Sequence, residues 1–147
     1  MTDLNLKKKK DYLNWNDIEN LVKKTALKIK EHNKEYDLIV SIKNGGIIPA
    51  KLISRELNIN DIDFISVKTD QIFTSNNFPR NKKYLVIDDI YDTGKTFSTV
   101  NKFFNSFEYD YACLVSRYRI TDNNGKIIMI GEILNHNKWI VFPWENR

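Results

Sequence analysis

The segment from Tyr84 to Thr96 constrains the fold more than any other part of the chain. It opens with an apolar run rich in β-branched residues, Tyr84 to Ile87, which is typical of a strand buried on both faces of a parallel sheet. Three carboxylates follow within residues 88 to 92, and a short turn at 93 to 96 leads into a helical pattern that begins at Phe97. A parallel strand followed at once by a helix predicts an α/β fold with ligand chemistry at the carboxyl end of the strand.

The turn at residues 93 to 96 favours an anion. Thr93-Gly94-Lys95-Thr96 presents backbone N–H groups and two hydroxyls beside the positive end of a helix, which suits a phosphate. Asp88 and Asp89 would repel that phosphate unless a cation or sugar hydroxyls lay between them. A phosphorylated sugar carrying Mg²⁺ meets both needs.

The same residues allow two other interpretations. The aspartates could be a solvated pair at a strand end, with Thr93 or Thr96 capping the next helix. The Gly-Lys-Thr ending also suggests a nucleotide-binding P-loop, but that motif requires glycine where Asp89 stands, which excludes it.

Residues 86 to 96 resemble the phosphoribosyl pyrophosphate loop of the type I phosphoribosyltransferases. That pattern consists of apolar residues, two acids, two variable residues and then Asp-Thr-Gly-x-Thr, and every position is filled here. The resemblance implies that Asp88 and Asp89 face the ribose hydroxyls and bind Mg²⁺, while residues Asp92, Thr93, Gly94, Lys95 and Thr96 wrap the 5′-phosphate. It also implies a single-domain, doubly wound and mainly parallel sheet over residues 12 to 147, with a mobile hood loop and a small C-terminal base-binding segment.

A second loop joins a buried-strand pattern at Asp37 to Ile42 to a helix in which Pro49 falls in the first turn. The loop is Lys43-Asn44-Gly45-Gly46. Its glycines allow a close approach of the backbone to a ligand, but a tight turn without a ligand would have the same sequence pattern. In the family this loop binds pyrophosphate, often with a basic residue directly before the glycines. Here Asn44 has that place and Lys43 precedes it, so the resemblance assigns the whole loop to phosphoribosyl pyrophosphate.

Residues 68 to 82 follow a predicted strand at Ile62 to Val67 and show neither helical nor strand periodicity. A stretch of this length in a compact domain indicates a lid, and the family has its hood here, which keeps water from the reacting sugar. Lys68 and Arg80 are the residues of this loop that we expect to contact pyrophosphate.

The remaining patterns predict the framework. A capping box at Asn16 and Glu19 begins a first helix that covers the sheet, and Cys113 falls in an apolar strand at residues 109 to 116, where it fills the core. A turn signal at residues 123 to 125 predicts a hairpin between 119–121 and 127–130. A further stripe at helical spacing is assigned to the core: Phe97, Val100, Phe103, Phe104 and Phe107.

The C-terminal stretch Trp139 to Glu145 is rich in large apolar groups, which core packing alone could explain, as we expect for Phe142. It also resembles the base-binding segment of the short bacterial xanthine-guanine phosphoribosyltransferases, in which a Trp-Ile pair precedes Pro-Trp and an acid. That resemblance implies that Trp139 stacks on the purine, Ile140 offers backbone contacts and Glu145 lies near the 2-position. Those enzymes bind the 6-oxo group with a lysine after the preceding strand, and Arg117 is the nearest equivalent of that lysine in this sequence.

Composition sets the outer bounds. The 147 residues carry a net charge of +4, which suits an acidic partner such as a polyphosphate substrate. Nucleic acid is not expected, since no zinc-ligand spacing or aromatic-basic motif is present. Residues 1 to 11, with the cluster Lys7 to Lys10, predict a disordered basic tail. Because no secretory signal or membrane span is recognisable, we expect a cytoplasmic protein without a membrane partner.

These inferences converge on an enzyme. We expect a pentosyltransferase of purine salvage that moves the phosphoribosyl group from phosphoribosyl pyrophosphate to N9 of guanine, xanthine or hypoxanthine, with Asp92 exchanging a proton at N7. The resemblance further implies a homodimer or homotetramer. Two alternatives stay open: a non-catalytic nucleotide-binding regulator of the same fold, and transfer to a different acceptor.

Overall fold

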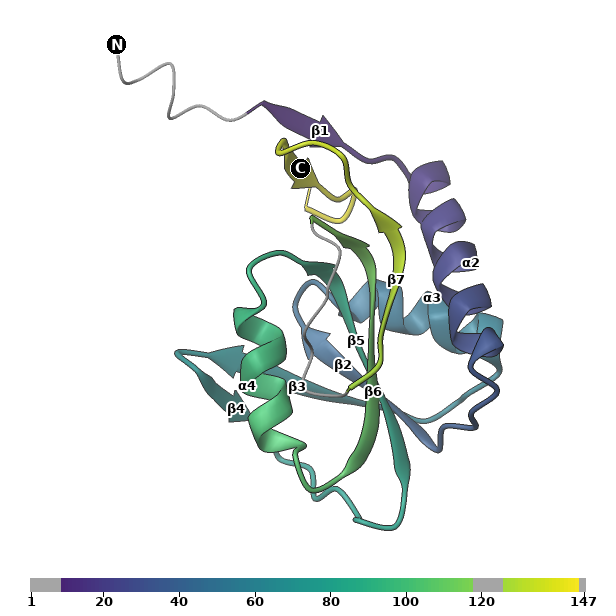
Figure 1. Ribbon diagram of the computed structural model, residues 1–147, viewed down its shortest axis with the longest axis vertical. Helices are drawn as coiled ribbons and strands as arrows, with labels where there is room; N and C mark the ends of the chain where they lie inside the picture. Colours follow the sequence, from purple (N-terminus) through teal and green to yellow (C-terminus); the bar gives the residue numbers. More distant parts are fainter. Residues whose placement is uncertain (1–8, 118–125, 146–147) are drawn as a thin grey trace.

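The computed structural model describes residues 9–117 and 126–145. Helices α2 and α3 cover one face of a central sheet and α4 covers the other (Figure 1). The described elements are β1 (Lys10–Tyr12), α2 (Trp15–Glu31), β2 (Leu38–Lys43), α3 (Ile47–Leu57), β3 (Ile62–Lys68), β4 (Gln71–Phe73), β5 (Lys83–Tyr91), α4 (Lys95–Phe103), β6 (Glu108–Ser116), β7 (Ile128–Ile133) and β8 (Trp139–Val141).

The central sheet has the strand order β4-β3-β2-β5-β6-β7, and all neighbours are parallel except β4 and β3. The predicted α/β class with a doubly wound, mainly parallel sheet is therefore confirmed. From β2 the chain winds outward through α3 to β3, and from β5 it winds the opposite way through α4 to β6. The connections that leave the carboxyl ends of β2 and β5 thus run in opposite directions along the sheet. Open α/β sheets bind ligands at such a switch point.

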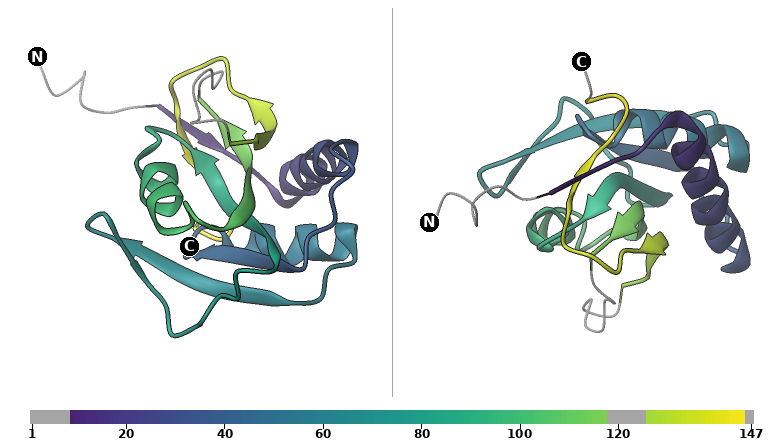
Figure 2. Two further views of the ribbon diagram at one scale, coloured as in Figure 1. Left: turned by 60° about the horizontal axis from the view of Figure 1, so that its bottom comes forward. Right: turned by 90° about the horizontal axis from the view of Figure 1, so that it is seen from above.

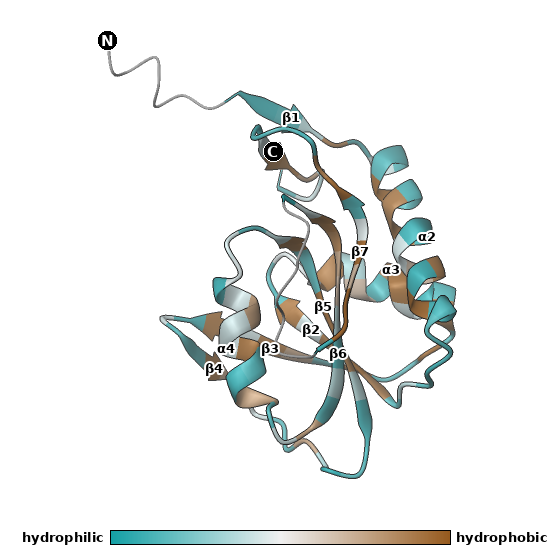
Figure 3. Ribbon diagram, viewed as in Figure 1, coloured by the Kyte–Doolittle hydropathy of each residue, from teal (hydrophilic) through white to brown (hydrophobic). Residues whose placement is uncertain are grey.

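Each face of the sheet has its own core, visible as the apolar centre of the strands in Figure 3. Under α2 and α3 the core is aliphatic, and the buried stripe of α2 is the one its helical periodicity predicts: Ile18, Leu21, Val22, Thr25, Ala26 and Ile29. Under α4 the core is aromatic. Its fully buried centre, Phe104, lies directly after the last residue of that helix.

The first helix begins two residues earlier than its sequence pattern suggested. Asn14, not Asn16, is the N-cap: its side-chain oxygen accepts the Asp17 N–H at 2.8 Å, and its own N–H donates to Asp17 Oδ2 at 2.8 Å. The prediction was wrong because the Asn-x-x-acid spacing occurs twice in succession, at Asn14 and at Asn16, and the earlier copy closes the capping box.

A second, two-stranded sheet joins the two ends of the described chain. Strand β1 pairs in parallel with β8, placing Lys10 opposite Trp139 and Asp11 opposite Ile140 (Figure 1). Lys10 and Asp11 were assigned to a disordered tail, but they belong to this strand because β8 satisfies their backbone. The rest of the expected tail, residues 1 to 8, lies outside the described residues.

The expected hood loop is partly ordered. Strand β3 turns back through Thr69 and Asp70 into β4, which pairs antiparallel with it beside α4 (Figure 2). Both turn residues have positive φ, 46° and 62°, as a two-residue hairpin turn requires. Sequence reasoning missed the hairpin because neither residue is the glycine or asparagine that usually marks such a turn.

The hairpin predicted around residues 123 to 125 falls outside the described residues. Its expected second arm is β7, which pairs in parallel with β6 at the edge of the sheet. In the part of the chain that the structure describes, no helix has the length and apolar character needed to cross a lipid bilayer.

Candidate active site

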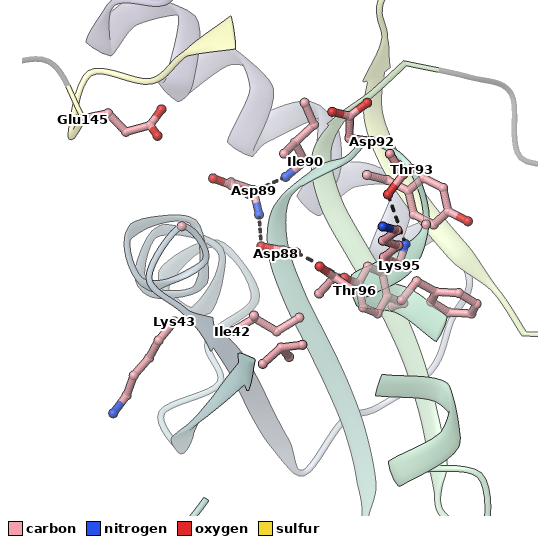
Figure 4. A pocket seen from close by; sticks show the side chains of 16 residues that line it. Ile42, Lys43, Asp88, Asp89, Ile90, Asp92, Thr93, Lys95, Thr96 and Glu145 are labelled. Carbon is pink, nitrogen blue, oxygen red and sulfur yellow. Dashed lines mark hydrogen bonds between the residues drawn. The ribbon is translucent and has the colours of Figure 1, made fainter. Parts of the chain in front are cut away.

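A cavity of about 310 Å³ opens at the switch point between β2 and β5 (Figure 4). It unites residues that the sequence placed in two separate loops. Of the predicted set, its lining includes Asp88, Asp89, Asp92, Thr93, Gly94, Lys95, Thr96, Lys43, Gly45 and Glu145.

Asp88 lies in β5 with only 7% of its surface exposed. Its Oδ1 accepts the Asp89 N–H at 2.8 Å, and its Oδ2 accepts the Tyr111 hydroxyl at 3.3 Å. Burial raises the pKa of the Asp88 carboxyl well above its ordinary value, and the neighbouring charge of Asp89 adds to the rise. Burial also raises the pKa of Tyr111, so its hydroxyl stays a donor. Sequence reasoning did not single out Tyr111, which falls within the strand predicted at residues 109 to 116.

Asp89 faces the loop after β2. Its Oδ1 accepts the N–H of Ile90 at 2.7 Å, and burial raises the pKa of its carboxyl. A β-carbon on Gly45 would lie 2.2 Å from Asp89 Oδ2, so the missing side chain at Gly45 is what makes room for this carboxylate. Two partly desolvated carboxylates side by side form a strongly negative site that favours a cation.

The turn after β5 is shaped by Gly94, which has a φ of +88° and is the N-cap of α4. A side chain there would also meet the Tyr91 hydroxyl, 2.8 Å from the position of a β-carbon. No side-chain hydrogen bond caps α4; Thr93 Oγ1 receives the Lys95 N–H at 3.4 Å, a long contact. The start of α4 therefore has no side-chain cap, and the residues of its first turn line the cavity, as an anion site requires.

The loop after β2 enters the site less completely than predicted. Gly46 and Asn44 do not line the cavity, and the Lys43 side chain points away from the two aspartates (Figure 4). A β-carbon on Gly46 would meet the Ile87 carbonyl at 2.6 Å, so this glycine serves the packing of α3 against β5. The peptide bond between Lys43 and Asn44 is cis.

The two basic candidates of the expected hood lie elsewhere. Lys68 is the last residue of β3 and does not line the cavity. Arg80 contacts Ser106 and its guanidinium lies 4.8 Å from the centre of the Phe107 ring, near the amino-terminal ends of β5 and β6. The prediction that Arg80 contacts pyrophosphate was wrong, because it lies at the opposite end of the sheet from Asp88.

A smaller cavity of about 80 Å³ adjoins the first and shares Asp89, Asp92 and Glu145 with it. All four residues predicted for the base line it: Trp139, Ile140, Glu145 and Arg117. Trp139 is half exposed, whereas Phe142 is buried, as expected, and stacks on Trp144 with ring centres 4.8 Å apart. Glu145 Oε1 accepts the Phe142 N–H at 3.0 Å, which closes the turn after β8.

Arg117 connects the two cavities. Its Nε lies 3.0 Å from Asp92 Oδ1, and its Nη1 donates to the Lys138 carbonyl at 2.7 Å. The Arg117 side chain is only 10% exposed, so this ion pair is sheltered from solvent on the arginine side. Sequence reasoning placed Arg117 near the base but did not foresee that it would hold Asp92.

The donor set suits Mg²⁺. Asp88 and Asp89 offer carboxylate oxygens, and no trio of His, Cys, Asp or Glu able to hold a metal ion occurs among the described residues. Mg²⁺ commonly binds in this way, through one or two carboxylates together with water and substrate phosphates.

Comparison with known proteins agrees with this geometry. The family description "Phosphoribosyl transferase domain" matches residues 8–145. Xanthine-guanine phosphoribosyltransferase of Idiomarina loihiensis is 24% identical over 144 residues, covering 91% of this chain and 86% of the relative. The enzyme of that name from Cereibacter sphaeroides is 28% identical over 124 residues, covering 77% and 71%.

Solved structures share the fold. A purine phosphoribosyltransferase from Pyrococcus horikoshii superposes with a TM-score of 0.71 at 27% identity, covering 94% of this chain and 95% of the other. A hypothetical protein from Neisseria gonorrhoeae with bound ppGpp gives a TM-score of 0.79 at 23% identity, covering 95% and 91%.

Proposed function

The chain belongs to the phosphoribosyltransferase family, and on that premise we propose that it transfers the 5-phosphoribosyl group from phosphoribosyl pyrophosphate to a purine base. The resemblance of residues 86 to 96 to this family is thereby confirmed. The observation that carries the proposal is the junction of two cavities: an acid pair beside a helix-start anion site, and next to it a cavity walled by an exposed indole.

The sugar-phosphate half is assigned to the turn after β5. The 5′-phosphate accepts hydrogen bonds from the backbone N–H groups of Thr93 to Thr96 at the start of α4, where the helix dipole adds to the attraction. The loop Lys43-Asn44-Gly45-Gly46 is assigned to the pyrophosphate side, since two of its residues, Lys43 and Gly45, line the cavity and Gly45 lies against Asp89. Lys68, at the carboxyl end of β3, is assigned to the same side.

Asp88 and Asp89 are the residues that would hold Mg²⁺. A magnesium ion held there would supply positive charge to offset that of the leaving pyrophosphate. Asp88 and Asp89 suit this role because burial raises the pKa of both carboxyls, and a nearby cation favours their charged forms. As the bond to pyrophosphate breaks, positive charge grows on C1′ and the ring oxygen, and the same carboxylates stabilise it.

Asp92 is assigned the proton exchange at N7 of the base. Its Oδ1 is bound by Arg117, so Oδ2 is the oxygen that we assign to the purine. Removing or sharing the N7 proton increases the electron density of the ring and makes N9 a better nucleophile.

The acceptor is assigned to the 6-oxopurines guanine, xanthine and hypoxanthine. Trp139 offers an indole face for stacking, and Ile140 offers backbone groups to the ring edge. Arg117 carries donors and no acceptor, so it matches a 6-oxo group and not a 6-amino group. Glu145 is assigned to the 2-position. Two relatives named as xanthine-guanine enzymes support this choice.

The test is a transfer assay with phosphoribosyl pyrophosphate, Mg²⁺ and each of guanine, xanthine, hypoxanthine, adenine and uracil. Nucleoside monophosphate and pyrophosphate should form in equal amounts with at least one 6-oxopurine. Product with adenine or uracil alone would reassign the acceptor. Nucleotide binding without product from any base would instead favour a non-catalytic regulator. The expected homo-oligomer and cytoplasmic location stay predictions.

A further inference from the structure

Lys138, directly before Trp139, has both of its backbone polar groups hydrogen-bonded to side chains. Its N–H donates to His136 Nδ1 at 3.0 Å, and its carbonyl accepts from Arg117 Nη1 at 2.7 Å. Each of these partners is itself held by an aspartate: His136 Nε2 lies 3.0 Å from Asp11 Oδ2, and Arg117 Nε lies 3.0 Å from Asp92 Oδ1. A continuous chain of contacts therefore joins strand β1 to Asp92 through the start of the base-binding strand.

The geometry selects one form of the imidazole ring. Because His136 Nδ1 accepts the Lys138 N–H, the ring proton lies on Nε2 and is donated to Asp11. In the doubly protonated ring both nitrogens are donors, and Nδ1–H would oppose the Lys138 N–H. The arrangement thus uses both ring nitrogens of a neutral histidine, one as donor and one as acceptor. A side chain with one polar atom cannot reproduce it.

We propose that Asp11 and His136 are positioning residues for the purine base. Through the Lys138 N–H they hold the backbone of Lys138, which leads directly into Trp139 and whose carbonyl anchors Arg117 and, through it, Asp92. This inference rests on the proposed function, because it assigns the base to Trp139.

The neighbouring charges are engaged elsewhere, which leaves Asp11 as the carboxylate bound to the ring. Asp11 and His136 border a hollow of about 470 Å³ that also contains Asp17, Lys24 and Glu132. Asp17 closes the capping box of α2, and Lys24 pairs with Glu132 at 2.8 Å. The Asp11 and His136 side chains are 34% and 24% exposed, so their contact is partly sheltered from water.

Backbone pairing supports the same role. The Trp139 N–H donates to the Lys9 carbonyl at 2.8 Å, and the Leu13 N–H donates to the Val141 carbonyl at 2.9 Å. These bonds align β8 with β1, and the Trp139 N–H shares its peptide plane with the Lys138 carbonyl that Arg117 holds. The preceding peptide plane, which carries the Lys138 N–H, is held by His136.

Three variants separate the two contacts of His136, one with the Lys138 N–H and one with Asp11. His136→Ala removes both contacts. His136→Asn keeps an oxygen that can accept the N–H two residues ahead, as asparagine does in an Asx turn, and loses Asp11. Asp11→Ala removes the aspartate alone. His32→Ala is the matched control, since His32 is exposed at the C-terminal end of α2, far along the helix from Asp11.

In steady-state kinetics, His136→Ala should raise the KM for the base about fivefold, the effect of losing one ordinary hydrogen bond. The KM for phosphoribosyl pyrophosphate should stay within about twofold, and His136→Asn should recover part of the loss. Equal rises in both KM values, or a His136→Asn variant no better than His136→Ala, would overturn the proposal.

Hydrogen exchange measured by mass spectrometry gives a readout that needs no substrate. Peptides covering residues 134 to 142 should exchange faster in His136→Ala and Asp11→Ala than in the wild type or His32→Ala. Unchanged exchange would refute the positioning role even if the kinetics shifted. If the wild type transfers to no purine, the proposed function fails, while this measurement still decides whether Asp11 and His136 hold the segment.

Discussion

The carboxylate of Asp89 occupies the space that a side chain on Gly45 would need. A β-carbon at position 45 would stand 2.2 Å from Asp89 Oδ2, whereas one at Gly46 would stand 2.6 Å from the backbone carbonyl of Ile87. A side chain is therefore excluded at the two adjacent positions for different reasons. The Asp89 carboxylate beside Gly45 can rotate away, whereas the backbone carbonyl beside Gly46 lies in the centre of a sheet and cannot.

Gly45→Ala should damage catalysis more than folding. The added methyl group displaces the Asp89 carboxylate from the position assigned to the metal and ribose, so kcat/KM for phosphoribosyl pyrophosphate should fall about 10- to 100-fold. The melting temperature should change little, because the clash is relieved by a side-chain rotation. A variant with normal kcat/KM would contradict the role of Asp89. Steady-state kinetics at saturating base measure the first quantity and thermal unfolding the second.

Gly46→Ala should show the reverse balance. Its methyl group would press on the Ile87 and Ile42 carbonyls, both in the strands that frame the switch point, and should cost about 1–3 kcal/mol of unfolding free energy. Denaturant titration of the two variants side by side measures the difference. Equal stability of the two would show that α3 shifts freely at its start.

Asp88→Asn should raise the stability of the protein and lower its activity. The amide removes a buried charge but can still accept the Asp89 N–H and bond to the Tyr111 hydroxyl, so in EDTA the unfolding free energy should rise by about 1 kcal/mol. Activity should fall at least about tenfold through loss of a metal ligand.

The stability gain of Asp88→Asn should depend on pH with a definite sign. Because the pKa of Asp88 is raised in the folded state, the folded wild type binds a proton more tightly than the unfolded chain, and it loses stability as the pH rises through the folded pKa. The gain should therefore be largest above the folded pKa of Asp88 and shrink as the pH falls toward the unfolded pKa of about 4. A gain that grows as the pH falls would contradict the direction of the shift.

Arg117→Lys should lower kcat/KM for the base about tenfold despite keeping the charge. A single ammonium cannot hold both Asp92 Oδ1 and the Lys138 carbonyl in the planar geometry of a guanidinium. Arg117→Met, which leaves Asp92 without its partner, should be worse. Kinetics of both variants with the preferred purine make the comparison, and a fully active Arg117→Met would show that Asp92 needs no partner.

Trp139→Ala should raise the KM for the base by about 5- to 100-fold, the range that loss of one stacking partner produces, and leave the KM for the sugar substrate nearly unchanged. Trp15→Ala is a suitable control, because Trp15 is exposed to a similar degree (55% against 50%) and lies outside the base cavity. If the sugar substrate were affected more than the base, Trp139 would be a structural residue.

The sequence by itself determined what is encoded in contiguous residues. The strand, acid pair and Gly94 turn could be recognised because one strand-turn-helix unit carries both its hydrophobic pattern and its anion site within residues 84 to 96. The buried stripe of α2 was equally readable, since helical periodicity is local. Trp139 and Glu145 were found for the same reason, as a short motif on a single segment.

The tertiary structure decided which distant residues meet. Register across β5 and β6 brings the Tyr111 hydroxyl to Asp88, and the parallel pairing of β2 with β5 sets Gly45 against Asp89. The pairing of β1 with β8 turns an expected tail into the support of the base strand. Arg80 shows the converse, because a basic residue near the site in sequence lies at the far end of the sheet. Such contacts depend on strand register and packing, which no local pattern of residues specifies.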